Sequence, residues 1–431
     1  MKRSNHIVEI KNFPVENVSL WYSTATDNAT LISEELNHLI DKPEEEIGDD
    51  PRILRLIEQR FVLPDTFDED KLTTYIFNSS KYSTKNLGVT IAPTMKCNFN
   101  CIYCFEDENT KKKDMDIDTA KRILKWLDKM LASMGVKKLE IQYFGGEPTQ
   151  NIEIVKYLAA EIKNLTQKHQ VELKNYIITN GYFDVGLIDT LLDLNIDNIQ
   201  FTIDGDKESH NRRKSLCSGS PTFDVVFNNF IAVVKRANEF NEIMLRINID
   251  ETNVNTVIPL LERVKSQVDV SGVTVDINET SWAHKKLEDY DEIHGWIVEL
   301  TQKALELGFQ YDFHLGHFES CNFSKQNNIA IGPDGNVYKC ILMIEEEAFR
   351  VCDIENYNDS LSMINFVEEN IDPECIKCKY GPMCFGGCRA SAYKRNGSVS
   401  RKICKKGYFS RYIVPHLKLF YGNIIEERLL K

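Results

Sequence analysis

Short apolar strands alternate with amphipathic helices between Leu87 and Glu279. The helix expected near Ala120–Met134 is typical, because its apolar residues form one stripe and Gly135 can end it. Six such β/α units predict a parallel sheet, which carries its chemistry on loops at the carboxyl ends of its strands. The predicted strands are Leu87–Ala92, Leu139–Phe144, Tyr176–Thr179, Ile199–Ile203, Met244–Ile249 and Val273–Ile277.

The first 84 residues follow a different pattern. Alternating and β-branched residues predict strands at His6–Ile10 and Val18–Tyr22, and three amphipathic helices are expected after them. This order favours a winged-helix-like module, and a cap without its own function is the other interpretation. The residues that mark the three helices are Leu31, Ile32, Leu36, Leu39 and Ile40, then Ile53, Leu54, Ile57 and Phe61, then Leu72, Tyr75 and Ile76.

Beyond about Phe309 the strand and helix signals weaken, while cysteines and glycines become frequent. A loop-rich segment with little apolar periodicity usually needs bound metal to hold it together. The expected organisation is therefore a module at residues 1–84, an α/β core at 85–309 and a loop-rich metal-binding domain at 310–431.

Composition narrows the possible functions. The 431 residues carry 65 acidic and 52 basic side chains, a net charge of -13, which argues against nucleic acid as the main partner. No apolar run is long enough for a membrane span or a secretory signal, so we expect a cytoplasmic protein without a membrane partner. Thiols stay reduced in the cytoplasm, so the 12 cysteines are expected to bind metal or act chemically.

The first group of cysteines directly follows the strand Leu87–Ala92. Cys97, Cys101 and Cys104 have the spacing Cys-x3-Cys-x2-Cys. Three thiolates this close can hold three irons of a four-iron cluster and leave the fourth iron open to another molecule. A structural zinc site would need a fourth ligand, and none is near in the sequence.

This triad, with Tyr103 before its third cysteine, resembles the signature of radical S-adenosylmethionine (radical SAM) enzymes. Three later strand ends resemble further elements of that family. They are Gly145-Gly146-Glu147-Pro148, Thr179-Asn180-Gly181, and Thr202-Ile203-Asp204-Gly205 followed by His210-Asn211-Arg212-Arg213.

The resemblance implies a partial (β/α)6 barrel that binds S-adenosylmethionine. Its cofactor-binding residues would be Gly145, Gly146, Glu147, Asn180, Thr202 and Arg213. Glu147 would meet the cofactor's amino group, whereas Thr202 and Arg213 would approach its ribose and carboxylate. Arg212 and Arg246 are other candidates for the arginine role. Because the cofactors carry the radical chemistry, no side chain is expected to act as catalytic acid or base.

A second group of seven cysteines occupies the last third of the chain. By itself, Cys375-x2-Cys378 with Cys384-x3-Cys388 could also form a zinc ribbon. The whole set resembles the SPASM extension of radical SAM enzymes that modify peptides, which implies two auxiliary four-iron clusters and three clusters in total. The nearer cluster would use Cys321, Cys340 and Cys388, and the outer cluster Cys375, Cys378, Cys384 and Cys404.

Two four-iron clusters need eight thiolates, and this group supplies seven. We favour an open iron in the nearer cluster that could bind a substrate thiolate, with Cys352 or a non-cysteine ligand as the other possibility. Cys217 has no partner spacing and no expected role.

The resemblance implies a peptide maturase that abstracts hydrogen from a ribosomal precursor peptide and forms a thioether or another crosslink. The N-terminal module would bind the leader of that peptide, and a flavodoxin or ferredoxin would supply electrons. The principal alternative is an anaerobic sulfatase-maturing enzyme, which forms formylglycine. A non-catalytic metal-stabilised binding protein is the alternative from another class, and it leaves the open cysteine triad unexplained.

Overall fold

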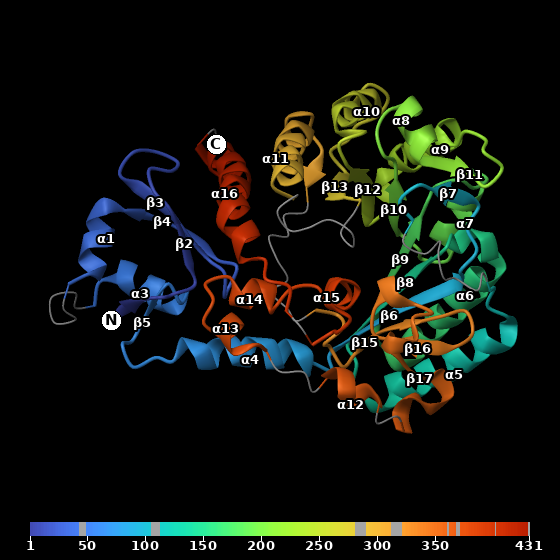
Figure 1. Ribbon diagram of the computed structural model, residues 1–431, viewed down its shortest axis with the longest axis horizontal. Coiled ribbons are helices and arrows are strands. Elements are labelled where there is room, and N and C mark those ends of the chain that lie inside the picture. The colour runs from blue at the N-terminus through green and yellow to red at the C-terminus, as the bar shows by residue number, and fades with distance from the viewer. Residues whose placement is uncertain are drawn as a thin grey trace. The chain divides into compact units, whose positions relative to one another are not determined.

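The computed structural model describes residues 1–42, 49–104, 113–280, 290–311, 321–359, 362–367, 371–400 and 402–429 (Figure 1). The chain forms two compact units. The first contains Met1–Tyr82, Phe313–Cys321 and Glu369–Lys431, and the second contains Ser83–Asp312 and Asn322–Glu368.

The second unit is built on a ten-stranded sheet with the order β14-β13-β12-β10-β9-β8-β6-β15-β16-β17. All six strands predicted from the sequence are present, and each pairs in parallel with its neighbours among the six. The parallel sheet expected of a radical SAM fold is therefore confirmed. These strands are β6 (Asn86–Thr94), β8 (Lys138–Gly145), β9 (Glu172–Thr179), β10 (Asn198–Thr202), β12 (Glu242–Ile249) and β13 (Val273–Glu279).

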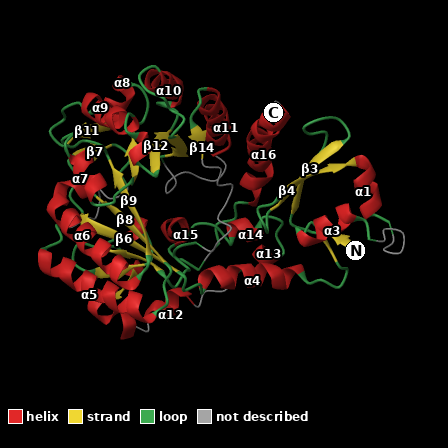
Figure 2. Ribbon diagram, turned by 180° about the vertical axis from the view of Figure 1, so that it is seen from behind, coloured by secondary structure: helices red, strands yellow, loops and turns green. Residues whose placement is uncertain are grey.

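Amphipathic helices cover the sheet, as α5 illustrates (Figure 2). Its first turn is capped by Asp116, whose side chain accepts a hydrogen bond from the Thr119 N–H, and its Ile123, Leu127 and Met130 are buried. Gly135 follows the helix with a φ of 62°, in the left-handed region that glycine tolerates. The unit's helices are α5 (Ile117–Ser133), α6 (Ile152–His169), α7 (Leu187–Asp193), α8 (Lys207–Arg213), α9 (Phe223–Val234), α10 (Val257–Lys265), α11 (Tyr290–Glu306) and α12 (Ser362–Val367).

Four further strands extend this sheet at its two edges. All four lie beyond residue 309, where the sequence predicts mainly loops, and three of them form one edge: β15 (Asn328–Ile331), β16 (Asn336–Tyr338) and β17 (Arg350–Asp353). Strand β15 pairs in parallel with β6, and β16 and β17 continue antiparallel. At the other edge, β14 (Gln310–Tyr311) pairs in parallel with β13. The loop expectation is wrong here because strands this short give little periodicity of their own.

The N-terminal part of the first unit contains an antiparallel sheet of β2 (Ile7–Ile10), β3 (Val18–Ser23) and β4 (Ala29–Ser33). One prediction is wrong at this point, because Leu31 and Ile32 lie in β4 and the first helix begins only at Glu34. Helices α1 (Glu34–Ile40), α3 (Pro51–Glu58) and α4 (Glu69–Lys81) follow. Phe61 lies beyond the end of α3, between it and the short strand β5 (Val62–Leu63), which pairs with β1 (Lys2–Arg3).

Each face of this small sheet packs against a different set of helices. Ile7, Trp21 and Ile32 form a core with residues of α1 and α3. The opposite face packs against C-terminal residues of the same unit; Val8, Ile10, Leu20 and Tyr22 meet Tyr380, Met383, Phe409, Ile413 and Leu417. These residues lie in or next to α14 (Gly381–Cys384) and in α16 (Lys406–Leu429). The same unit also contains α13 (Pro373–Ile376) and α15 (Arg389–Asn396). Among the described helices, none is both long and apolar enough to cross a lipid bilayer.

Candidate radical SAM site

The cysteine triad follows the carboxyl end of β6, as the sequence predicts. The short strand β7 (Phe99–Cys101) pairs antiparallel with β11 (Lys214–Leu216), and this pairing holds the loop against the unit. Cys97 and Cys101 are half-buried and Cys104 is exposed. The Phe99 N–H approaches the Cys97 Sγ at 3.4 Å, so a backbone donor already faces one thiol.

The chemistry of this donor set fits an iron–sulfur cluster. Burial raises the pKa of the Cys97 thiol, and the Glu147 carboxylate raises it further. Burial also raises the pKa of the Cys101 thiol. Both groups therefore stay protonated without metal, and iron binding must release their protons. Three cysteines on one loop would hold three irons of a cluster and leave the fourth iron accessible.

Gly145 and Gly146 bring the end of β8 against the cysteine loop. A Cβ on Gly145 would lie 2.2 Å from the Thr94 carbonyl oxygen, and one on Gly146 would lie 2.3 Å from the Lys96 carbonyl oxygen. The Gly146 and Glu147 N–H groups donate to these same carbonyls, at 3.1 and 2.9 Å. The glycines are thus required by close packing of two backbone segments of this chain, a reason not anticipated from the sequence.

Glu147 is buried, and its carboxylate joins the ends of β8 and β9. One oxygen accepts hydrogen bonds from Thr149 and from the Thr179 hydroxyl, and the other accepts from the Asn180 N–H at 2.7 Å. The Asn180 side chain in turn donates to Asn98 in the cysteine loop at 2.7 Å. Glu147 and Asn180 therefore position the loop, and burial raises the pKa of the Glu147 carboxyl.

Arg213 stands out among the three arginine candidates. Its side chain is only 2% exposed, and its Nη1 donates to Asp250 at 2.7 Å and to Thr252 at 2.9 Å. Its Nε and Nη2 are buried and have no hydrogen-bond partner in this structure. Buried N–H groups without a partner are costly, so they suit an added anion such as a carboxylate.

The other two arginines have their groups engaged elsewhere. Arg246 forms an ion pair with Asp276 at 2.6 Å, and Arg212 donates to the Ser209 hydroxyl at 3.2 Å. Thr202, at the end of β10, is 9% exposed.

Tyr103 links the cysteine loop to the ends of β10 and β12. Its hydroxyl donates to Asp204, and the Asn248 amide approaches the same hydroxyl at 3.3 Å. The Arg213 guanidinium lies 5.1 Å from the centre of the Tyr103 ring. Lys214 also contacts Tyr103 and Cys101, and sequence reasoning missed it because no motif or spacing distinguishes this lysine.

The structure brings the outer set of auxiliary cysteines together in the first unit. Cys375 and Cys384 lie close enough to each other and to Cys378 for their charges to interact, and Cys404 acts on Cys384 in the same way. Burial raises the pKa of Cys375 to about 11.

The nearer set is divided between the units, with Cys321 and Cys388 in the first and Cys340 in the second. Its assignment stays a prediction. Within the described residues, no three Cys, His, Asp or Glu side chains converge closely enough to hold one metal ion. Each cluster iron takes its own thiolate, so cluster ligands need not converge on one point.

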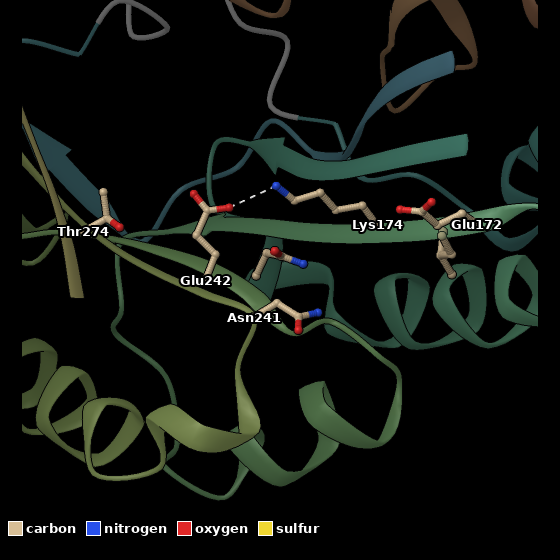
Figure 3. Close-up of a pocket in the computed structure, with 7 residues that line it drawn as sticks. Glu172, Lys174, Asn241, Glu242 and Thr274 are labelled. Carbon is tan, nitrogen blue, oxygen red and sulfur yellow. Dashed lines mark hydrogen bonds and ion pairs between the residues drawn. The ribbon is translucent and has the colours of Figure 1, made fainter. Parts of the chain in front are cut away.

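A pocket of about 470 Å³ lies at the opposite end of the strands (Figure 3). It is lined at the amino ends of β9 and β12, where Lys174 and Glu242 face each other in an ion pair of 3.0 Å. The cysteine loop follows the carboxyl end of β6, and β6 runs parallel to the other central strands. This pocket therefore lies at the end of the sheet away from the cysteine loop.

Residues 91–252 match the family model of the Radical SAM superfamily. This segment includes the cysteine triad, the glycine pair and Arg213. The chain therefore contains a radical SAM domain, and this domain implies a four-iron cluster together with S-adenosylmethionine.

Two of its relatives align with most of the chain. The chain is 22% identical over 384 residues to the radical SAM cyclopropyl synthase TigE of Paramaledivibacter caminithermalis, covering 79% of this chain and 74% of TigE. It is 24% identical over 380 residues to the cysteine-type anaerobic sulfatase-maturating enzyme of Clostridium perfringens, covering 78% of this chain and 99% of that enzyme.

Two solved structures share the fold. The structure of anSMEcpe with bound AdoMet has a TM-score of 0.60 at 19% identity and covers 79% of this chain and 98% of its own. Streptococcus suis SuiB bound to precursor peptide SuiA has a TM-score of 0.51 at 14% identity and covers 93% of this chain and 98% of its own.

Proposed function

We propose that this enzyme is a peptide maturase that abstracts hydrogen from a ribosomal precursor peptide and forms a thioether or another crosslink. The observation that carries this proposal is the combination, in one chain, of the cysteine loop with a small sheet whose strand β4 pairs on one side only among the described residues. The first part supplies radical chemistry, and the second suits capture of a peptide strand.

In the proposed site the protein binds and orients the cofactors. Cys97, Cys101 and Cys104 would hold the cluster, and the two buried N–H groups of Arg213 that make no hydrogen bond would bind the carboxylate of S-adenosylmethionine. When bound, these cofactors supply the 5′-deoxyadenosyl radical that abstracts hydrogen from an unactivated carbon. Glu147 and Asn180 would keep the cysteine loop at a fixed distance from the strand ends.

The N-terminal sheet would bind the leader at strand β4. This strand lies at the edge of the sheet, and the hydrogen bonds of Ser23 to Asn28 and of Glu34 to Asn17 fix its register with β3. Along an antiparallel pair, residues whose backbone groups bond to the partner strand alternate with residues whose backbone groups do not. The N–H and C=O groups of Thr30 and Ile32 therefore face β3, whereas those of Leu31 face outward. The Leu31 side chain is 43% exposed. A peptide strand added here would gain main-chain hydrogen bonds and an apolar contact.

The extents of the structural likenesses support a peptide substrate. The likeness to SuiB spans 93% of this chain and that to anSMEcpe spans 79%. The SuiB structure contains a bound precursor peptide. A chain with a leader-binding module is expected to resemble the precursor-peptide enzyme SuiB over more of its length than it resembles anSMEcpe.

Two auxiliary clusters complete the proposal. Cys375, Cys378, Cys384 and Cys404 would hold the outer cluster, and Cys321, Cys340 and Cys388 the nearer one. Seven thiolates for two four-iron clusters would leave one iron of the nearer cluster open to a substrate thiolate, unless Cys352 completes it. An electron donor such as a flavodoxin or ferredoxin would reduce the enzyme.

Formylglycine formation on a sulfatase is the second candidate, favoured by the sulfatase-maturating relative. Deuterium transfer distinguishes the two functions. The cluster-loaded enzyme is incubated anaerobically with S-adenosylmethionine, a low-potential reductant and one of two deuterated peptides. The first is a short peptide encoded beside the gene, and the second carries a cysteine-type sulfatase motif.

We expect deuterium in 5′-deoxyadenosine only with the first peptide, together with a crosslinked product. Transfer only from the sulfatase peptide would establish the second candidate instead. Transfer from neither peptide, under conditions where S-adenosylmethionine is cleaved, would overturn both. A variant with Cys97, Cys101 and Cys104 replaced by alanine controls for background cleavage.

A further inference from the structure

Lys214 is a buried lysine beside the cysteine loop. Lys214 is 5% exposed. Its Nζ lies 3.6 Å from the Cys101 Sγ and 3.3 Å from the Tyr103 hydroxyl. The rings of Phe99 and Tyr103 lie 5.8 and 5.6 Å from the same nitrogen. The ammonium is therefore enclosed by groups of the cysteine loop.

The backbone explains why this side chain points at a cysteine. Strands β7 and β11 pair antiparallel with Lys214 directly opposite Cys101, and opposite residues of an antiparallel pair project from the same face. The Lys214 carbonyl also accepts a hydrogen bond from the Thr222 hydroxyl, which fixes the strand from its other side. The contact is thus set by register.

The guanidinium charge of Arg213 is paired with carboxylates, whereas the ammonium charge of Lys214 has no carboxylate in contact with it among the described residues. Arg213 forms an ion pair with Asp250 at 2.7 Å and lies 3.9 Å from Asp204. In the part of the chain that the structure describes, no carboxylate lies within 4 Å of the Lys214 nitrogen. The Asp204 carboxylate acts on this ammonium only from farther away, and the Tyr103 hydroxyl contacts both groups. A buried ammonium that touches no anion is costly. A Cys101 thiolate, present once the residue binds iron, would provide that partner.

We propose that Lys214 donates a charge-assisted hydrogen bond to the Cys101 thiolate and thereby raises the reduction potential of the cluster on the triad. Reduction adds one electron from an external low-potential donor to the cluster, breaks no bond and makes the cluster more negative by one charge. A fixed cation at one of its sulfur ligands stabilises the reduced form more than the oxidised form. Lys214 is thus a positioning residue that acts through Cys101.

The test is an anaerobic redox titration of the cluster-loaded enzyme, followed by electron paramagnetic resonance. The signal of the triad cluster is identified as the one that disappears when Cys97, Cys101 and Cys104 are replaced by alanine. In Lys214→Met we expect the ratio of reduced to oxidised triad cluster at a fixed potential to fall about tenfold, which for one electron equals about 59 mV. Lys214→Arg keeps the charge and is expected to stay near the wild-type ratio.

Lys174→Met is the matched control, because Lys174 lies at the amino end of β9, and it should leave the ratio unchanged. An unchanged ratio in a fully loaded Lys214→Met variant would overturn the proposal. If that variant does not take up iron, Lys214→Gln replaces it, since it keeps an N–H donor without the charge. Equal ratios for Lys214→Gln and Lys214→Arg, or failure of both folded variants to load the triad, would equally overturn it.

The inference depends on the triad cluster and not on the peptide substrate. A normal iron content with an unchanged potential would refute the role of Lys214 alone. Absence of the triad signal from the wild-type enzyme would instead refute the cluster assignment.

Discussion

Arg212 and Arg213 are neighbours in the sequence, yet of the two only Arg213 is buried with N–H groups that make no hydrogen bond. Position in α8 (Lys207–Arg213) accounts for the difference, because adjacent helical residues point about 100° apart. The sequence motif allows either arginine, whereas burial favours Arg213. The sequence thus predicts an arginine at this place, and the structure is needed to choose between Arg212 and Arg213.

His210, on the same helix, makes the enzyme's stability depend on pH. Burial lowers its pKa to about 3, and the charges of Lys214 and Arg213 contribute to that change. Between about pH 3 and 6.5 the unfolded chain therefore binds more protons than the folded chain, so the free energy of unfolding falls as the pH falls. From about pH 6.5 to about pH 5.5 we expect a loss of about 1 kcal/mol from this residue, measured by urea unfolding under anaerobic conditions.

The variant His210→Asn isolates this effect. It keeps an acceptor for the Asp204 N–H, which approaches the His210 Nδ1 at 3.3 Å. The variant should lose the pH-dependent part of the stability whatever its absolute stability. Replacing His38, whose side chain is 75% exposed, should leave the pH slope as in the wild type. A slope that persists in His210→Asn would contradict the assignment.

At the scale of elements, the six central strands could be predicted because each is an apolar run between turn residues. Leu31 and Ile32 were misassigned because their spacing to Leu36, Leu39 and Ile40 also fits a helical face. Pairing with β3 outweighs that pattern: Leu31 lies opposite Leu20, and Ile32 opposite Ser19. Such a contact between separate segments leaves no local signal, so the sequence alone could not decide it.

Strand β4 is also where leader binding can be tested. In Leu31→Pro the outward N–H is lost while the hydrogen bonds of Thr30 and Ile32 to β3 can remain. We expect the affinity for the leader peptide, measured by fluorescence anisotropy, to fall at least about tenfold, as for the loss of one to two hydrogen bonds. Leu31→Ala keeps the N–H and should lose less. If both variants bind the leader like the wild type, the leader does not dock on this edge.

At the scale of the whole molecule, the cysteines give a prediction in iron atoms. Three four-iron clusters correspond to about 12 irons per chain after anaerobic reconstitution. Replacing the triad by alanine should leave about eight irons and abolish cleavage of S-adenosylmethionine, and replacing the outer set should also leave about eight. Cys217→Ala serves as the control with unchanged iron. A preparation that binds zinc alone, or about four irons per chain, would contradict the three-cluster assignment.

Cysteine spacing is informative because metal ligands often lie close together along the chain. The four outer cysteines are near one another in the structure, and their role as ligands stays a prediction. Lys214 had no comparable signal. Its importance depends on the pairing of β7 with β11, two strands that are more than one hundred residues apart. Sequence motifs therefore predict the ligands of such a site better than the side chains that surround them.

The two faces of the N-terminal sheet have consequences for the synthesis of the chain. One face packs on α1 and α3, which leave the ribosome soon after the sheet. The other face contains Val8, Leu20 and Tyr22, and its packing partners Met383, Phe409 and Leu417 are synthesised much later. This apolar face is uncovered while most of the chain is being made, so we expect the nascent module to need a chaperone or a delay before it is stable. Removing residues 1–82 would in turn remove apolar contacts from the segment that carries Cys378 and Cys384.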